Sequence, residues 1–277
     1  MTQISSSKLL SSALTALGGV AEVLVPGDDG YAGIAATLFA DGTPDLVVRP
    51  PDAAGVAAAL RYAADAGLAV TVRSGGHSMA GLSTSADGMI IDTRRISGVR
   101  LLDPVSGRVR VGAGATWGAV AAALSPLGLG LTAGDTNQVG VGGLTLGGGI
   151  GWMVRRHGLA IDSLAAVQVV TADGRLIGAD AVEHADLFWA LRGGGGNFGV
   201  VTSLELRLHP VGPEVLAGLV VHPADRGPEL LRLFRDVMRD APDELGLAFA
   251  YATADDGQPA VMVAGMYAGS VSESRIS

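Results

Sequence analysis

The sequence contains no cysteine, which excludes disulfides, thiolate catalysis and cysteine-ligated metals in this chain of 277 residues. Its five histidines lie far apart, with no spacing typical of a zinc site, so we expect no metal. Lysine is nearly absent too, because Lys8 is the only one, and arginines are scattered through a chain of net charge −8. Since no basic stripe is present, we expect no nucleic-acid partner.

The chain also lacks a long uninterrupted apolar run. The uncharged stretch 111–134 is long enough to cross a bilayer, but glycines, Ser125 and Pro126 interrupt it, and we interpret it as buried core. The N-terminus resembles a signal peptide only faintly, since serines flank Lys8 and no convincing cleavage site follows. We therefore expect no membrane partner and a cytoplasmic protein, with secretion left open as an alternative. The oligomeric state is not indicated.

Glycine is abundant instead, with 42 residues, and it forms three dense clusters. The first is Arg73-Ser74-Gly75-Gly76-His77-Ser78, which follows the apolar run 68–72, interpreted as a buried strand. The second cluster spans 140–151 and the third spans 193–199. Backbone without side chains lets a ligand approach closely, and its N–H groups can bind a phosphate. Three such clusters in one domain predict one long ligand of the length of a dinucleotide.

The second cluster matches neither common phosphate motif. Thr145 stands where G-x-G-x-x-G needs its third glycine after Gly140 and Gly142, and no G-x-x-x-x-G-K-[ST] loop is present. Between its glycines stand Val, Leu and Ile rather than the polar residues of a flexible linker. The pattern favours backbone that passes close to a large flat ligand. By the same reasoning, we expect a β-carbon at Gly76 to obstruct the ligand.

The order of elements predicts an α+β fold. A strand at 45–49, a helix capped by Asp52 and ended by Gly67, and the strand before His77 form a strand–helix–strand unit. Such a unit delivers its loop at the carboxyl end of a strand, where open sheets bind ligands. Besides a leading helix within 1–40, the pattern predicts a strand at 89–92, hairpins at 99–111 and 164–177, helices at 117–124 and 187–191, and a strand at 200–208.

Pro210 and Pro213 mark a boundary, after which the pattern changes. A strand at 215–221, a helix around 230–238 and paired strands at 245–251 and 260–267 predict the start of a second α+β domain. The last seven residues carry no helix or strand signal, and we expect a half-built sheet with an open apolar edge. The expected division is an N-terminal lead-in at 1–42, a ligand-binding domain at 43–212 and a partial substrate domain at 213–277.

Residues 43–212 resemble the FAD-binding domain of the p-cresol methylhydroxylase (PCMH)/vanillyl-alcohol oxidase superfamily, most nearly the berberine-bridge-enzyme-like oxidases. The resemblance implies a two-lobed PCMH-type FAD-binding domain, followed by the first part of an α+β substrate domain with an antiparallel sheet. The motifs that carry it, in this order and spacing, are Arg73 to Ser78, 139–151 followed by 156–159, 169–174, and 186–201.

The resemblance implies a covalent flavin, in which His77 is joined to the 8α-methyl carbon of FAD. Many relatives have a second link through a cysteine, but the matching position here is Thr136, so only a single link is expected. The resemblance also implies which residues line the pyrophosphate and the rest of the cofactor: Arg73, Ser74, Gly75, Gly76, His77, Ser78, Met79, Thr136, Gly140, Val141, Gly142, Gly143, Leu144, Ile150, Asn197 and Val201.

The implied reaction removes a hydride from a small-molecule C–H bond next to oxygen or nitrogen, with O₂ as the acceptor. Related enzymes continue well beyond this length, so an alternative is a flavin-binding but catalytically incomplete fragment, and we assign no catalytic base. Another alternative is an α/β-hydrolase using Ser78, because Gly76 to Ala80 looks like the G-x-S-x-G elbow with alanine in the last place. That motif needs a helix directly after the serine, and 81–88 is a poor helix former.

Overall fold

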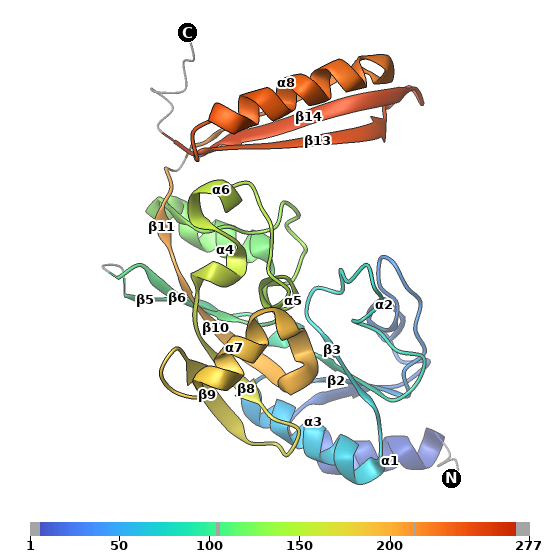
Figure 1. Cartoon of the computed structure of the whole chain (residues 1–277). Coiled ribbons are helices and arrows are strands. Elements are labelled where there is room, and N and C mark those ends of the chain that lie inside the picture. The colour runs from blue at the N-terminus through green and yellow to red at the C-terminus, as the bar shows by residue number, and fades with distance from the viewer. Residues whose placement is uncertain (1–5, 104–105, 213, 270–277) are drawn as a thin grey trace.

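The computed structural model describes residues 6–103, 106–212 and 214–269 (Figure 1). Residues 6–212 form the larger part, and a three-stranded sheet with one long helix forms the C-terminal end. Within the described residues, no helix has both the length and the hydropathy needed to cross a membrane. The turn at 104–105, the boundary residue Pro213 and the last seven residues, named in the sequence predictions, lie outside the described residues.

The first sheet has the strand order β1-β2-β4-β3. Strands β2 and β3 both run parallel to β4, and β1 pairs antiparallel with β2. Helix α3 connects β2 to β3; the Asp52 side chain accepts a hydrogen bond from the Gly55 N–H, and Gly67 ends the helix at φ 66°. The predicted strand–helix–strand unit is therefore confirmed. The elements of this part are α1 (Ser6–Leu17), β1 (Glu22–Leu24), α2 (Ala32–Ala35), β2 (Leu46–Arg49), α3 (Ala53–Ala66), β3 (Val70–Arg73), β4 (Met89–Asp92) and η1 (Thr93–Arg95).

Two expectations for this part are wrong. The strand before His77 is not buried, because β3 lies at the edge of the sheet and Val70 is 36% exposed, whereas all four residues of β4 are buried. An apolar run predicts a strand but does not distinguish an edge from a centre. The leading segment is also more than a helix, since α1 is followed by β1 and α2.

The second sheet is antiparallel, with the order β5-β6-β10-β8-β9, and contains both predicted hairpins. Its core includes Val109, Val169, Leu204 and Leu206, which have no exposed surface. Thr116 caps α4 by accepting from the Ala119 N–H, as predicted. The elements here are β5 (Val99–Asp103), β6 (Arg108–Gly112), α4 (Trp117–Leu124), η2 (Ser125–Leu127), β7 (Leu129–Gly130), α5 (Val141–Leu146), α6 (Val154–His157), η3 (Ala160–Ser163), β8 (Leu164–Val170), β9 (Leu176–Asp180), α7 (Ala185–Gly194), η4 (Gly195–Phe198), β10 (Val200–Arg207) and β11 (His209–Pro210).

The C-terminal sheet has the order β12-β14-β13, with all pairs antiparallel. Helix α8 runs along this sheet (Figure 1), and Phe234 on the helix contacts Phe249 on β13 with ring centroids 5.8 Å apart. The predicted helix and antiparallel strands are thus confirmed. The elements are β12 (Leu216–Pro223), η5 (Ala224–Arg226), α8 (Gly227–Asp240), β13 (Leu245–Thr253) and β14 (Pro259–Tyr267).

Two arginines of α6 join the C-terminal sheet to the rest of the molecule. Arg155 donates to the carbonyl oxygens of Ala241 at 2.8 Å and Leu245 at 3.3 Å. Arg156 donates to the Ala268 carbonyl oxygen at 2.7 Å. Charge-assisted bonds of this kind fix orientation as well as adding energy. The start of β13 and the end of β14, which pair at the open end of the hairpin, are therefore both tied to one short helix.

Candidate cofactor site

The first glycine cluster leaves the carboxyl end of β3 at Arg73, whose side chain is only 5% exposed. Its guanidinium donates to the Ala36 carbonyl oxygen at 2.9 Å, and the Arg73 carbonyl oxygen accepts from the Thr93 hydroxyl at 3.0 Å. Burial lowers the pKa of Arg73, and the nearby charge of Arg94 lowers it further. Arg73 is thus buried at the base of the loop, where its hydrogen bonds hold the loop to Ala36 and Thr93.

One fully buried carboxylate holds the cations beneath this loop. Asp92 has no exposed surface, and it accepts from Arg94 Nη2 at 2.8 Å and from Arg49 Nε at 3.3 Å. Asp92 also accepts from the Arg94 N–H and so caps η1, which follows β4 directly. A buried carboxylate with two arginine partners fixes the end of β4 beside the base of the loop.

Gly76 is required by the chain itself. Its φ is +75°, and an added β-carbon would lie 2.5 Å from the Arg73 Cζ. Both the left-handed backbone and this contact exclude a side chain before any ligand is considered. A substitution at Gly76 therefore cannot test whether a cofactor approaches this residue.

His77 and Ser78 lie at the turn of the loop. His77 is half-buried, and Met79 is 82% exposed. The Ser78 hydroxyl oxygen accepts from the Leu82 N–H at 3.1 Å, and the Gly81 N–H donates to the Ser78 carbonyl oxygen. The residues that follow Ser78 form turns instead of a helix. The geometry that a nucleophile elbow requires is therefore absent from these described residues.

The second glycine cluster packs directly against the first. A β-carbon on Gly75 would lie 2.9 Å from both the Gly140 Cα and the Gln138 carbonyl oxygen, so the two backbones touch. Gly140 then begins α5, a short helix that the sequence pattern did not predict. The glycines of that segment concealed it, because glycine has a low helix propensity. The structure thus brings the first two clusters together.

Not all of these glycines have the same cause. A β-carbon on Gly142 would lie 2.8 Å from the Ala113 carbonyl oxygen, so chain packing explains this glycine. An added β-carbon on Gly143 meets no atom within 4 Å, and Gly143 is exposed. Packing within the chain does not explain its lack of a side chain, whereas close approach of a ligand would.

The two residues predicted at or after the third cluster differ in exposure. Asn197 is exposed, and its side-chain amide donates to the Gly194 carbonyl oxygen at 2.7 Å. Val201 is 4% exposed, its side chain belongs to the core of the five-stranded sheet, and it pairs with Val169 on β8, so the structure gives it a role in packing. Gly195 and Gly196 border open space. This cluster supplies backbone rather than charged side chains.

The remaining predicted residues border the second cluster. Thr136 is exposed, and its hydroxyl donates to the Asp135 carboxylate at 3.1 Å. Ile150 is 74% exposed, and Leu144 is partly buried against the core. Val141 has no exposed surface, so its side chain is structural. Exposed apolar side chains beside bare backbone are suited to a flat ring system.

These features fit FAD. Backbone N–H groups and open glycine positions suit a pyrophosphate, and Met79, Leu144 and Ile150 offer apolar surface to rings. The buried Arg73 Nε has no hydrogen-bond partner in the described structure. No group of three metal-ligating side chains occurs in the described part of the chain.

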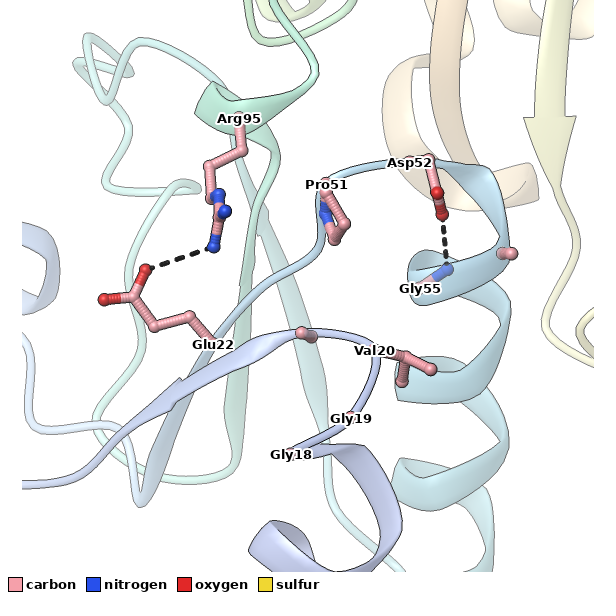
Figure 2. Close-up of a pocket in the computed structure, with 10 residues that line it drawn as sticks. Gly18, Gly19, Val20, Glu22, Pro51, Asp52, Gly55 and Arg95 are labelled. Atoms are coloured by element: carbon pink, nitrogen blue, oxygen red, sulfur yellow. Dashed lines mark hydrogen bonds and ion pairs between the residues drawn. The ribbon is translucent and has the colours of Figure 1, made fainter.

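A pocket of about 520 Å³ lies elsewhere, between the end of α1 and the start of α3 (Figure 2). None of its ten lining residues belongs to the predicted cofactor set. Its polar groups are already paired, because Arg95 lies 3.5 Å from the Glu22 carboxylate and Asp52 accepts from the Gly55 N–H. The pocket therefore gives no reason to place the cofactor site there.

Sequence reasoning missed the segment from Gly112 to Ala115. It follows β6 directly and contacts the first two glycine clusters, through Ser74 and Gly142. The signal that could have found it is the run Gly-Ala-Gly-Ala after a strand, since alternating small residues indicate close backbone packing.

Comparisons with known proteins agree with this geometry. Residues 44–180 match the FAD binding domain family. The chain is 38% identical over 219 residues to the (R)-6-hydroxynicotine oxidase of Paenarthrobacter nicotinovorans, an alignment that covers 78% of this chain and 46% of that protein. It is also 38% identical over 176 residues to the xylooligosaccharide oxidase of Thermothelomyces thermophilus, covering 62% of this chain and 35% of that protein.

Solved structures show the same fold. The 6-hydroxy-D-nicotine oxidase of Arthrobacter nicotinovorans superposes with a TM-score of 0.84 at 32% identity, covering 91% of this chain and 56% of that one. The berberine bridge enzyme of Eschscholzia californica superposes with a TM-score of 0.83 at 28% identity, covering 94% and 55%. The chain therefore spans about half the length of the relatives that it matches.

Proposed function

The chain belongs, through the FAD binding domain at residues 44–180, to the vanillyl-alcohol oxidase superfamily, and we propose that it is an FAD-dependent oxidase of a small organic molecule. Bound FAD would accept a hydride from a C–H bond next to oxygen or nitrogen, with O₂ as the final electron acceptor. The observation that supports this most is the contact between Gly75 and Gly140 beside the open space at Gly143.

The class of substrate follows from the relatives' names. They include oxidases of 6-hydroxynicotine, xylooligosaccharide and chitooligosaccharide. Because the chain spans only about half of such relatives, the proposal stops at the class of C–H bond and names no catalytic base. A second candidate is a chain that binds FAD without oxidase activity of its own, since the family match at residues 44–180 is to a FAD binding domain alone.

We further propose that His77 forms one covalent bond to FAD. The half-buried imidazole lies directly after Gly75 and Gly76 in the loop that meets the second cluster. In the net step, an imidazole N–H and one 8α-methyl C–H are replaced by an N–C bond. The two electrons and two protons released reduce O₂ to hydrogen peroxide. With no cysteine in the chain, the bond through His77 would be single.

The test of this proposal is the fate of the flavin on acid precipitation. We expect the purified protein to be yellow and the flavin absorbance to remain with the precipitate. A His77→Ala variant should bind FAD but release it on denaturation, whereas His184→Ala, on the exposed turn before α7, should behave as wild type. Flavin freely extracted from the wild type would contradict the covalent bond, and absence of any flavin would contradict the function.

A second experiment tests where the cofactor lies. Gly143→Leu adds a side chain to open space, so the cofactor-free protein should keep its melting temperature while FAD loading falls at least tenfold. The matched control is Gly178→Leu on β9, which is also exposed with no atom within 4 Å of an added β-carbon. Full loading in Gly143→Leu would show that the cofactor does not pass this residue.

Hydrogen peroxide formation separates the two candidate functions. An oxidase should release it with an alcohol, sugar or amine donor, and its yield should match substrate consumption. A chain that binds FAD without oxidase activity should retain the flavin but produce no peroxide with any of these donors.

A further inference from the structure

One buried backbone unit, Ala113, connects the segments that carry the three glycine clusters. Its carbonyl oxygen accepts from the Ser74 hydroxyl at 2.7 Å and from the Gly142 N–H at 3.1 Å. Its own N–H donates to the Thr202 carbonyl oxygen at 3.0 Å, next to Val201 on β10. Ala113 is 3% exposed, so water does not compete for these bonds.

The neighbours of Ala113 hold it in place. The Gly114 N–H donates to the Ile96 carbonyl oxygen at 3.0 Å, and the Ala115 carbonyl oxygen accepts from the Val141 N–H at 2.9 Å. A β-carbon on Gly112 would collide with the Ile96 carbonyl, and one on Gly114 would collide with the Thr93 carbonyl. The segment 112–115 therefore has little freedom to move away from the loops that it connects.

The Ser74 hydroxyl has a single hydrogen to donate, and it donates this hydrogen to the Ala113 carbonyl oxygen. The pyrophosphate of FAD is ionised near neutral pH, so its oxygens accept hydrogen bonds and donate none. Ser74 could therefore donate to a pyrophosphate only by breaking its bond to Ala113. Ser78 in the same loop differs, because its oxygen accepts from Leu82 and its hydrogen has no acceptor among the described residues.

We propose that Ser74 is a positioning residue, which couples the His77 loop to the Gly140–Gly143 backbone through the Ala113 carbonyl oxygen, and is not a ligand of the cofactor. This inference rests on the proposed function. Its consequence is that the orientation of His77 toward FAD depends on the second cluster. Ser74 should therefore affect the rate of covalent attachment more than the affinity for FAD.

The first test measures both quantities in Ser74→Ala. At saturating FAD, the rate constant of covalent attachment to cofactor-free protein should fall about tenfold, as expected from the loss of one buried hydrogen bond. In a His77→Ala background, which isolates noncovalent binding, adding Ser74→Ala should leave the dissociation constant for FAD within twofold. The matched control, Ser12→Ala, removes an exposed hydroxyl on α1, outside the predicted cofactor set, and should leave the attachment rate at saturation unchanged.

The opposite pattern would overturn the proposal. If Ser74 is a direct ligand, Ser74→Ala should raise the dissociation constant about tenfold and leave the attachment rate at saturating FAD unchanged. An unchanged rate together with an unchanged dissociation constant would equally contradict a positioning role.

A second measurement does not depend on the flavin at all. In the cofactor-free His77→Ala protein, Ser74→Ala should speed amide hydrogen exchange in peptides covering 139–146, while Ser78→Ala should not. Unchanged exchange in Ser74→Ala would overturn the coupling even if FAD binds as proposed. If Ser74→Ala speeds exchange but the protein that retains His77 never attaches FAD, the coupling is kept and the covalent function is rejected. The two failures are therefore distinguishable.

Discussion

The two larger sheets within residues 6–212 and the C-terminal sheet within 214–269 differ in how far their apolar strands are covered. All four residues of β4 are buried, whereas no residue of β12 is. On β12, Leu216, Leu219 and Val220 are between 52% and 59% exposed. As expected from the sequence, the C-terminal sheet has an open apolar edge, and such edges favour pairing with another strand.

The difference shows that the strands of residues 6–212 are buried more completely than those of residues 214–269. In the first part, helices and a second sheet cover the strands, and the glycine clusters meet on that covered framework. In the second part, α8 packs on a sheet that leaves the strand β12 exposed. Because a cofactor site needs a rigid support, we expect the first part to provide the binding loops.

The largest expected effect contrasts two leucines, one in each part. Leu204 on β10 has no exposed surface, and Leu204→Ala should lower the free energy of unfolding by about 3 kcal/mol through the cavity it leaves. Leu219 on β12 is 59% exposed, and Leu219→Ala should change it by less than about 0.5 kcal/mol. Urea unfolding followed by tryptophan fluorescence measures both. Equal losses would mean that β12 is covered in solution.

A somewhat smaller effect contrasts two carboxylates. Asp92→Asn leaves Arg49 and Arg94 facing a neutral amide and should destabilise the protein by about 2 kcal/mol, since both guanidinium groups retain some exposure. Asp236 on α8 pairs with Arg239 at 3.0 Å in an exposed position, and Asp236→Asn should cost less than about 0.5 kcal/mol. Thermal unfolding of the two variants tests this, and an Asp92→Asn protein as stable as wild type would refute the structural role of the carboxylate.

The smallest effect lies at the junction of the two parts, where the rings of His157 and His209 stack 3.9 Å apart. Burial, His209 and Arg156 lower the pKa of His157 to about 4, although Glu244 opposes this shift. Burial, with Arg207 and Arg156, also lowers the pKa of His209. When the pKa of a histidine is lower in the folded protein than its unfolded value of about 6.5, the unfolded state binds the proton more readily. The free energy of unfolding then decreases as pH falls from the unfolded pKa to the folded pKa.

We therefore expect stability to decrease from about pH 6.5 toward pH 4. His157→Phe keeps a stacked ring that cannot be protonated, and it should flatten this dependence. The control is His222→Phe on β12, which should leave the dependence unchanged. Melting temperatures across the pH range measure the effect, and an unaltered slope in His157→Phe would reject the junction histidines as its cause.

Local signals in the sequence predicted many of the elements correctly. Asp52 caps the start of α3, Gly67 ends that helix, and Thr116 caps the start of α4. The sequence shows these limits because a capping side chain and a left-handed glycine act within a few residues of the chain. The glycine clusters were likewise visible in the sequence, and two of them touch in the structure. The covalent link, O₂ as acceptor and the role of each predicted cofactor residue stay predictions.

Patterns in the amino-acid sequence predicted most of the helices and strands in their order and excluded cysteine chemistry, but they missed β1, α2 and α5. The packing of distant segments was needed to show that β3 is an edge strand and that Arg73 is buried at the base of its loop. It also showed that Gly143 borders open space, whereas Gly140 and Gly142 do not. The two kinds of feature differ because the interactions that cause them act over different distances along the chain. Backbone propensities and caps act between residues close in the chain, whereas burial and shared hydrogen-bond acceptors such as Ala113 arise only when distant segments pack together.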